Sequence, residues 1–297
     1  MKIAQINNIA GVGSILAEQQ RKEGHEVEVF VFNEIAYEQF GGRKFNYYSP
    51  FDRWKIFRIL KKYDIWHYHY PYGSLKRKLD KGHSNSKVYL KHYHGNDLRK
   101  SQDNDFCLVA TPDLLKYAPN AKWIPTPIDL KEIRSTAASS KFEENEVVKV
   151  AHYPYFRNYS SVDHYSDTLN ALEKEQRCKV VQVINQPHLE VLRILNKCDI
   201  VVGKIASDLG WFGKFELEGM ALGKPVITYV AEELYSQYNP PIYRTSKDTF
   251  KRDLEALIED NSERSRLSKE GREYVVKNHS AETVSKTVMQ SYQIWSN

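Results

Sequence analysis

The first segment that could do chemistry is Gly11-Val12-Gly13-Ser14, which stands between an apolar strand pattern and a helix pattern. Glycine lets the backbone approach a ligand closely, and the N-terminus of a helix favours negative charge. Leu16 takes the place of the third glycine of a dinucleotide fingerprint, and the Gly-Lys-Ser/Thr ending of a P-loop is missing. The segment is therefore either an anion-binding loop or a plain tight turn.

A second segment, residues 91–99, follows a strand pattern and reads Lys-His-Tyr-His-Gly-Asn-Asp-Leu-Arg. Polar groups at the ends of strands in a parallel sheet converge where polar ligands bind. His94 and Asp97 are the groups in this run that could serve such a ligand. The alternative is a loop with an Asx turn and a surface histidine.

Histidines alternate along two neighbouring strand patterns. His67 and His69 lie in the first, and His92 and His94 in the second, so each pair faces one side of its strand. Imidazole is a common zinc ligand, which makes a metal site an alternative interpretation. No carboxylate or cysteine stands at ligand spacing, and we therefore expect no metal ion here.

The third segment, residues 210–227, runs from a Gly-rich turn through a helix pattern into an apolar strand pattern. The turn presents free backbone N–H groups to an anion, and a Glu one turn into the helix could accept hydrogen bonds from ribose hydroxyls. The alternative is structural, with Glu216 on a solvent-facing side and Met220, Ala221 and Leu222 in the core.

The elements that must position these segments alternate between strand and helix. Besides the strand at 2–6, the helix at 15–23 and the strand at 27–32, strands are expected at 64–68, 88–92, 107–110, 123–124, 147–152, 179–184, 199–202 and 225–229. Helices are expected at 53–62, 163–174, 189–197, 216–222, 248–260, 263–278 and 281–295. Such alternation predicts parallel sheets with helices on both faces.

A polar stretch at 131–146 interrupts this alternation, and we interpret it as an interdomain linker. The predicted fold class is α/β, with two Rossmann-like, doubly wound domains at 1–130 and 147–297. In such folds ligands bind outside the carboxyl ends of the strands. The last helix, 281–295, packs either with the other C-terminal helices or back on the first domain.

Charge is unevenly distributed along the chain. The 297 residues include 43 Lys and Arg against 38 Asp and Glu, and 41% are hydrophobic, which excludes a disordered chain. Residues 1–130 hold 20 basic and 14 acidic side chains, and the basic excess concentrates in 53–100. This asymmetry indicates an anionic partner for the first domain only.

Cysteine usage and the absence of targeting patterns indicate a cytoplasmic protein. Cys107, Cys178 and Cys198 are scattered, which argues against a disulfide framework and a zinc site. We find neither a signal-peptide pattern nor a run of the 18–20 or so apolar residues that a membrane helix needs. Any membrane contact is therefore expected to be peripheral.

Together, the three segments resemble the GT-B glycosyltransferases of family 4 in their order and spacing. The resemblance covers nearly the whole chain, and its most specific piece is 218–227. Weaker pieces lie at 24–27, 63–67, 110–115, 125–129 and 271–275. It implies two domains facing across a cleft, with the acceptor bound by the first and a UDP- or GDP-linked sugar donor by the second.

The resemblance also implies roles for single residues. His94 and Asp97 match the H-G-x-D loop, where the histidine faces the transferred sugar, and Gly11 to Ser14 match the glycine loop near the diphosphate. Arg157 matches the arginine that contacts the diphosphate. Glu218 matches the second Glu of the E-x7-E element, which binds the donor ribose. Transfer in this family retains configuration, and cations and N–H groups neutralise the leaving group without a metal or other cofactor.

Two positions depart from the family pattern, because Gly210 stands at the first Glu and Ser160 at a lysine. Lys204 and Lys214 are plausible substitutes for the missing cation, and Asp208 could lie near the missing carboxylate. The expected catalytic residues are His94, Asp97 and Arg157. The expected donor-binding residues are Gly11, Gly13, Ser14, Arg157, Lys204, Gly213, Lys214 and Glu218.

The basic stretch has aromatic residues among its cations. Its expected acceptor or membrane face comprises Arg53, Trp54, Arg58, Lys61 and Lys62. Such a segment fits an anionic membrane or a lipid-linked acceptor, whereas the alternative is an ordinary sheet-covering helix with a charged outer face. For the whole chain, the alternative function is a non-catalytic nucleotide-sugar- or glycan-binding protein. We do not expect nucleic-acid binding, because the sequence shows no DNA-reading motif.

Overall fold

The computed structural model describes residues 1–32, 40–46, 49–71, 77, 79–81, 88–99, 101–138, 147–154 and 164–296. The chain divides into two compact units. Unit 1 comprises Met1–Pro127 and His279–Asn297, and unit 2 comprises Ile128–Asn278. Each unit is built on its own parallel sheet.

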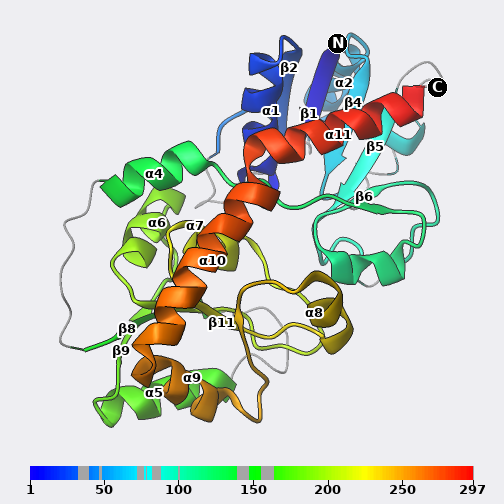
Figure 1. Ribbon diagram of the computed structural model, residues 1–297. Coiled ribbons are helices and arrows are strands. Elements are labelled where there is room, and N and C mark those ends of the chain that lie inside the picture. The colour runs from blue at the N-terminus through cyan, green and yellow to red at the C-terminus, as the bar shows by residue number, and fades with distance from the viewer. Residues whose placement is uncertain are drawn as a thin grey trace. The chain divides into compact units, whose positions relative to one another are not determined.

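Unit 1 contains a seven-stranded parallel sheet in the order β3-β2-β1-β4-β5-β6-β7. Its strands are β1 (Lys2–Ile6), β2 (Glu26–Phe32), β3 (Arg43–Phe45), β4 (Ile65–His69), β5 (Val88–Tyr93), β6 (Leu108–Val109) and β7 (Lys122–Trp123). Its helices are α1 (Val12–Lys22), α2 (Pro50–Leu60) and α11 (Ala281–Ser296), with short 3-10 turns η1 (Ile9–Gly11) and η2 (Pro112–Tyr117). Helix α11, the red helix in Figure 1, contacts α1 and β5.

The two faces of this sheet carry different cores because side chains alternate along each strand. Ile3 of β1 and Leu90 of β5 pack with residues of α1 and α11 on one face. Ala4, Trp66 and other residues of the opposite face pack with α2. The histidines of β4 and β5 share the α1 and α11 face, since they alternate with residues of the α2 face. That placement puts them against the C-terminal helix.

Unit 2 contains a five-stranded parallel sheet in the order β12-β11-β10-β8-β9. Its strands are β8 (Lys149–His152), β9 (Lys179–Gln182), β10 (Ile200–Val202), β11 (Val226–Thr228) and β12 (Tyr243–Arg244). Its helices are α4 (Leu130–Ala138), α5 (His164–Lys174), α6 (His188–Asn196), α7 (Lys214–Ala221), α8 (Glu232–Tyr238), α9 (Phe250–Glu259) and α10 (Asn261–His279).

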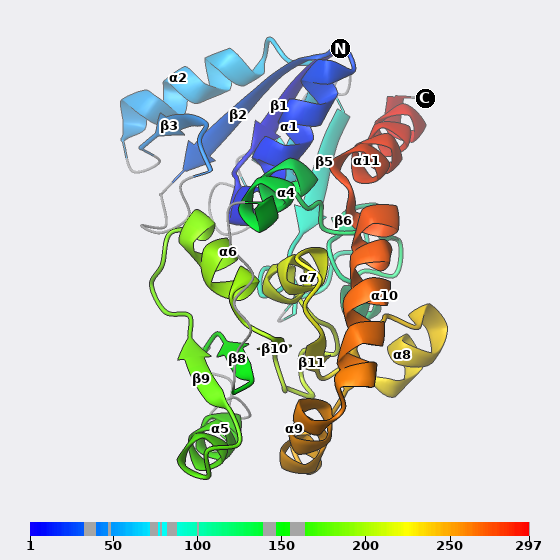
Figure 2. The ribbon, with the colours of Figure 1, turned by 60° about the vertical axis from the view of Figure 1, so that its left-hand side comes forward.

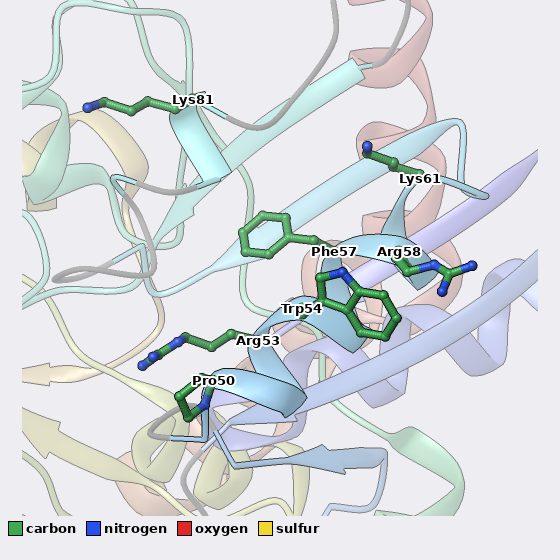
Figure 3. Close-up of a pocket in the computed structure, with 7 residues that line it drawn as sticks. All are labelled: Pro50, Arg53, Trp54, Phe57, Arg58, Lys61 and Lys81. Carbon is green, nitrogen blue, oxygen red and sulfur yellow. The ribbon is translucent and has the colours of Figure 1, made fainter.

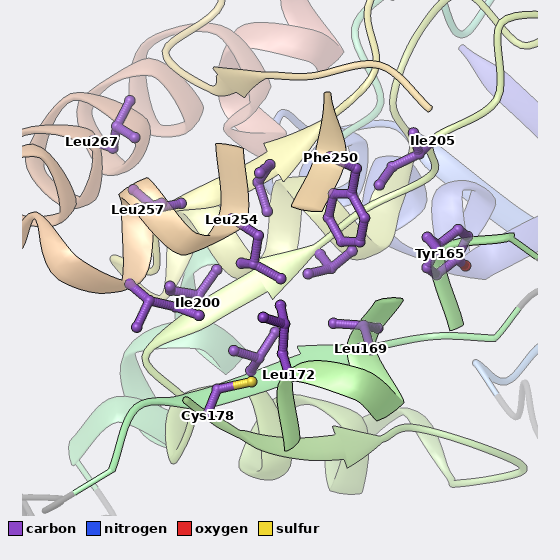
Figure 4. Close-up of a cluster of buried hydrophobic side chains, with 14 residues drawn as sticks. Tyr165, Leu169, Leu172, Cys178, Ile200, Ile205, Phe250, Leu254, Leu257 and Leu267 are labelled. Atoms are coloured by element: carbon purple, nitrogen blue, oxygen red, sulfur yellow. The ribbon is translucent and has the colours of Figure 1, made fainter. Parts of the chain in front are cut away.

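Helices cover both faces of the unit 2 sheet. Figure 2 shows α5 and α9 on one side of the strands, and α6 and α7 on the other. Leu169 and Leu172 from α5 meet Phe250 and Leu254 from α9 around Ile200 of the central strand β10 (Figure 4). The two parallel sheets and their helices confirm the predicted α/β fold class. Among the described residues, no helix combines the length and the apolar character needed to cross a membrane.

The structure differs from the predicted linker at 131–146. Residues Leu130–Ala138 form α4, which belongs to unit 2, whereas 139–146 lie outside the described residues. Asp129 caps the helix by accepting hydrogen bonds from the N–H groups of Lys131 and Glu132 at 2.9 and 3.1 Å. The Ser-Thr-Ala-Ala run resembles a loop in composition, but alanine is the strongest helix former.

Candidate functional site

In unit 1, the glycine loop between β1 and α1 is closed by its own side chains. Gly11 has φ +75°, and a Cβ placed there would lie 2.5 Å from the Phe40 ring, so this position requires glycine. Asn8 accepts a hydrogen bond from the Ser14 N–H at 3.0 Å, and its amide donates to the Ser14 hydroxyl at 2.7 Å. The Ser14 hydroxyl in turn donates to the Phe40 carbonyl. The Ser14 N–H and hydroxyl groups are therefore both engaged, one with Asn8 of the loop and one with Phe40.

The loop after β5 is shaped by Asp97. Its carboxylate accepts hydrogen bonds from the backbone N–H of His94 at 3.0 Å and of Gly95 at 2.7 Å. Gly95 has φ +146°, and a Cβ there would lie 2.7 Å from the Arg99 side chain. Burial raises the pKa of Asp97 to about 6, even though these N–H groups and Arg99 oppose the shift. Asp97 is thus placed to hold the loop that carries His94.

His94 of this loop lies beside the three histidines of β4 and β5, which are His67, His69 and His92. His67 and His92 bring ring nitrogens to 3.2 Å, and so do His69 and His94. His67, His69 and His92 each place one ring nitrogen within 4.8 Å of the others, a spacing that could hold a metal ion. Here, however, both nitrogens of His67 and both of His69 make hydrogen-bond contacts, the outer ones with Tyr292 and Gln5.

In unit 2, Glu216 ties the Gly-rich turn to the strand before it. Its carboxylate accepts hydrogen bonds at 3.0 Å from the backbone N–H groups of Lys204, just after β10, and of Gly213, just before α7. The side chain is 1% exposed, so the alternative of a solvent-facing Glu216 is wrong. A Cβ at Gly203 would lie 2.6 Å from Glu216, which leaves no room for a larger residue there.

Glu218 lies two residues further into α7, and its carboxylate contacts a histidine and a lysine. Its Oε1 is 2.6 Å from Nε2 of His188 and 3.2 Å from Nζ of Lys214. Burial alone would raise the pKa of Glu218, but Lys214 and His188 outweigh it and lower the pKa below its usual value. No described residue hydrogen-bonds its other oxygen, Oε2.

His188 was not predicted from the sequence, although it is central to this cluster. Its Nδ1 lies 3.4 Å from the carboxylate of Glu132 in α4, and its Nε2 contacts Glu218. The sequence offers one signal, which is the position of His188 directly after Pro187 at the first residue of α6, the helix that follows β9. Lys204 reaches the same turn, because its Nζ would lie 3.4 Å from a Cβ at Gly213.

Comparisons with known proteins show which solved structures share this architecture. No family model and no curated protein matches the chain. Among solved structures, a sucrose-phosphate synthase from Thermosynechococcus elongatus has a TM-score of 0.67 at 16% identity, covering 99% of this chain and 98% of that chain. Anabaena HepE, solved in complex with UDP-glucose, has a TM-score of 0.67 at 12% identity, with 99% of both chains covered.

A glycosyltransferase from Rickettsia africae has a TM-score of 0.65 at 12% identity, covering 99% of this chain and 98% of that chain. These structural neighbours are GT-B glycosyltransferases. The chain has the GT-B fold. This confirms the resemblance at the level of the fold, whereas membership of family 4 stays a prediction.

Gly210, which stands where the family 4 pattern has a glutamate, has a backbone conformation that disfavours that residue. Its φ is +70°, a conformation that residues with a Cβ rarely adopt. Trp211 and Phe212, which follow it, stack on each other at 4.6 Å and are buried. The turn is therefore held by packing, and Asp208 at its start is exposed.

Two other expectations concern the segment after β8. Arg157 and Ser160 lie outside the described residues, so the predicted diphosphate contact of Arg157 stays a prediction. His152, the last residue of β8, was not predicted as a site residue. It is 1% exposed, and neither ring nitrogen has a hydrogen-bond partner among the described residues. Burial lowers the pKa of His152 to about 4, so the ring is neutral near pH 7.

The predicted acceptor face in unit 1 forms a hollow of about 570 Å³ on α2. It is lined by Pro50, Arg53, Trp54, Phe57, Arg58, Lys61 and Lys81. Figure 3 shows Trp54 beside Arg58, whose guanidinium lies 4.7 Å from the ring centroid. Trp54 is 56% exposed, and none of the described residues that line the hollow is acidic. Lys62 is exposed but does not line it.

Proposed function

We propose that the protein is a glycosyltransferase that moves a sugar from a nucleotide diphosphate to an acceptor hydroxyl. The observation that carries the proposal is the Glu218 cluster at the start of α7, held in a GT-B unit by the buried Glu216. Oε2 of Glu218 is available to accept hydrogen bonds from vicinal ribose hydroxyls. The UDP-glucose complex of HepE supports a UDP- or GDP-linked donor.

The charge that develops on the leaving diphosphate requires fixed cations or N–H donors. Lys204 and Lys214 converge on the Gly213 turn, and Arg157 is the third cation that we assign to this task. Lys214 also contacts Glu218, so one ammonium group could link the ribose and diphosphate positions. We propose transfer with retention of configuration, as the resemblance to family 4 implies. We propose that no metal is needed, because these groups supply the required positive charge.

The acceptor is proposed to be anionic or lipid-linked. The α2 hollow in unit 1 presents four cations and the exposed aromatic ring of Trp54. Each Lys or Arg near an anionic membrane surface contributes roughly 1 kcal/mol, so the cluster suits such a surface. The protein would then work at the cytoplasmic face of a membrane as a peripheral protein.

A donor screen tests the proposal. UDP-, GDP- and ADP-sugars are added in a thermal-shift assay, where a ligand at about 100 times its Kd stabilises the fold by about 2.7 kcal/mol. The variant Glu218→Gln should weaken donor binding about 10- to 100-fold, because a hydrogen bond to a charged group contributes about 1.5–3 kcal/mol. The matched control is Glu233→Gln, an exposed residue of α8, and it should leave binding unchanged.

A second candidate, a non-catalytic binding protein, is favoured by one observation. Gly210 stands at the first Glu of the family pattern and has a conformation in which a glutamate would be strained. Donor binding with no hydrolysis or transfer would support this candidate. Absence of any stabilisation by nucleotide sugars would refute both.

A further inference from the structure

A connected set of buried polar side chains runs from α11 through α1 and β1 to His94. Its fully buried members, each 0% exposed, are Gln5, Gln20, His67, His69, His92 and Tyr292. A buried polar group without a hydrogen-bond partner costs about 1–3 kcal/mol. Donors and acceptors must therefore alternate along the set, so that fixing one member fixes the next.

Met289 determines which end of the Gln20 amide faces α11. Its thioether sulfur can only accept a hydrogen bond, and Nε2 of Gln20 lies 3.6 Å from it. Gln20 therefore turns its NH2 group toward α11 and its oxygen toward β1. That oxygen accepts from Nε2 of Gln5 at 2.8 Å, which leaves the Gln5 oxygen facing His69.

The orientation of Gln5 then determines the protonation of two histidines. Oε1 of Gln5 lies 2.7 Å from Nε2 of His69, so this ring nitrogen must carry the hydrogen. Burial lowers the pKa of His69 well below its usual value, so the ring is neutral and its Nδ1 has a lone pair. Nε2 of His94, 3.2 Å away, must donate to that lone pair.

We infer that Gln5 and His69 are positioning residues that hold His94 as the Nε2–H tautomer and leave its Nδ1 able only to accept a hydrogen bond. No described residue hydrogen-bonds this Nδ1. A phosphate oxygen has no hydrogen to give it, whereas a hydroxyl does. In the proposed function, on which this role of His94 rests, Nδ1 is therefore suited to a sugar hydroxyl and not to the diphosphate.

A second chain of hydrogen bonds starts from the same two glutamines and leads to His67 and His92. The Tyr292 oxygen receives the amide groups of Gln5 and Gln20 at 3.3 and 3.4 Å, so its hydrogen points to Nδ1 of His67 at 2.7 Å. His67 then donates from Nε2 to Nδ1 of His92. The branch ends at Nε2 of His92, which has no partner among the described residues. All four rings are neutral in this arrangement, as burial requires.

The direct test is the tautomer of His94 in the intact protein. Long-range 1H–15N correlation spectra of 15N-labelled protein distinguish a protonated from an unprotonated ring nitrogen, and loss of the signals in His94→Ala assigns them. We expect Nε2 protonated and Nδ1 unprotonated. A protonated Nδ1, or an even mixture of the two forms, would overturn the inference without any further variant.

Gln5→Leu removes the acceptor that faces Nε2 of His69. A buried N–H group without an acceptor is costly, so His69 is no longer held as the Nε2–H tautomer, and its Nδ1–H form can donate to Nε2 of His94. The signal of a protonated Nε2 in His94 should therefore fall and that of a protonated Nδ1 appear. The control Gln182→Leu makes the same change at an exposed position of β9 and should leave the His94 signals in place. Unchanged His94 signals in folded Gln5→Leu would overturn the relay.

Two further readouts separate this inference from the proposed function. If His94 accepts from a sugar hydroxyl, Gln5→Leu should lower kcat about tenfold, and Gln182→Leu should not. A switched tautomer with unchanged kcat would support the relay and overturn the role of His94 in transfer. Elemental analysis of the purified protein is the second readout, because a stoichiometric metal on His67, His69 and His92 would overturn the relay.

Discussion

The buried carboxylate of Glu216 offers the sharpest test of how the donor unit is built. In Glu216→Gln, the side chain keeps one acceptor oxygen but replaces the other by an NH2 group. Glu216 accepts from two backbone N–H groups, those of Lys204 and Gly213, each at 3.0 Å. The substitution must therefore leave one of these N–H groups facing a donor.

The cost follows from this geometry. An unsatisfied buried N–H costs about 1–3 kcal/mol, and the remaining hydrogen bond is no longer charge-assisted. We therefore expect the local free energy of opening of the turn to fall by about 2–3 kcal/mol. Because 1.4 kcal/mol is tenfold, the amides of Lys204 and Gly213 should exchange with solvent about 30- to 100-fold faster.

Amide hydrogen exchange, followed by NMR, measures this effect at the two residues concerned. The control Glu233→Gln changes an exposed glutamate in the same unit and should leave both exchange rates unchanged. Exchange at Lys204 and Gly213 within about threefold of wild type in Glu216→Gln would refute the assignment of Glu216 as the residue that holds the turn.

Three other predictions concern single features of the two units. The pKa of Asp97 rises from 3.8 to about 6 on folding, so its contribution to stability is present below pH 3.8 and is lost as the pH rises through 6. In urea titrations, the free energy of unfolding of the wild type should therefore fall by about 3 kcal/mol relative to that of Asp97→Asn across this pH range. Gly210→Glu should destabilise the fold by about 1–2 kcal/mol in thermal unfolding and should not raise the transfer rate, because φ is +70°. The double variant Arg58→Glu, Lys61→Glu should bind anionic vesicles at least 30-fold more weakly in sedimentation assays and should keep the stabilisation by the donor. The control Lys277→Glu changes an exposed lysine of unit 2, and an equal loss of vesicle binding in it would refute α2 as the membrane-binding surface.

The fold could be predicted because its signals are local. Strands and helices alternate with the periods of 2 and 3.6 residues that the sequence displays, and parallel strands require such alternation. Helix α4 was missed because residues 130–138 have a loop-like composition, although Ile133 and Thr136 are spaced to share one buried face. The local composition favours a loop there, whereas burial of one face favours a helix, and the helix forms.

The site was only partly predictable because several of its contacts join distant parts of the chain. Glu218 stands in a recognisable helix, but its partner His188 lies 30 residues earlier. Tyr292 and His67 are 225 residues apart, and no spacing rule links them. The cluster of histidines was visible as alternation on two strands, whereas the partners that orient their nitrogens come from β1, α1 and α11.

Asp97 and Glu216 show that a carboxylate in a motif can serve to hold a loop. Asp97 accepts the N–H groups of His94 and Gly95, and Glu216 accepts those of Lys204 and Gly213. Each loop follows a buried parallel strand, and the residue proposed to meet the ligand, His94 or Glu218, lies three or two positions from its carboxylate. A buried carboxylate that satisfies backbone N–H groups fixes a loop more firmly than packing alone, because charge-assisted hydrogen bonds are directional and strong. The two units therefore share one arrangement, in which an acid shapes the loop and so holds the neighbouring side chain that we propose to contact the ligand.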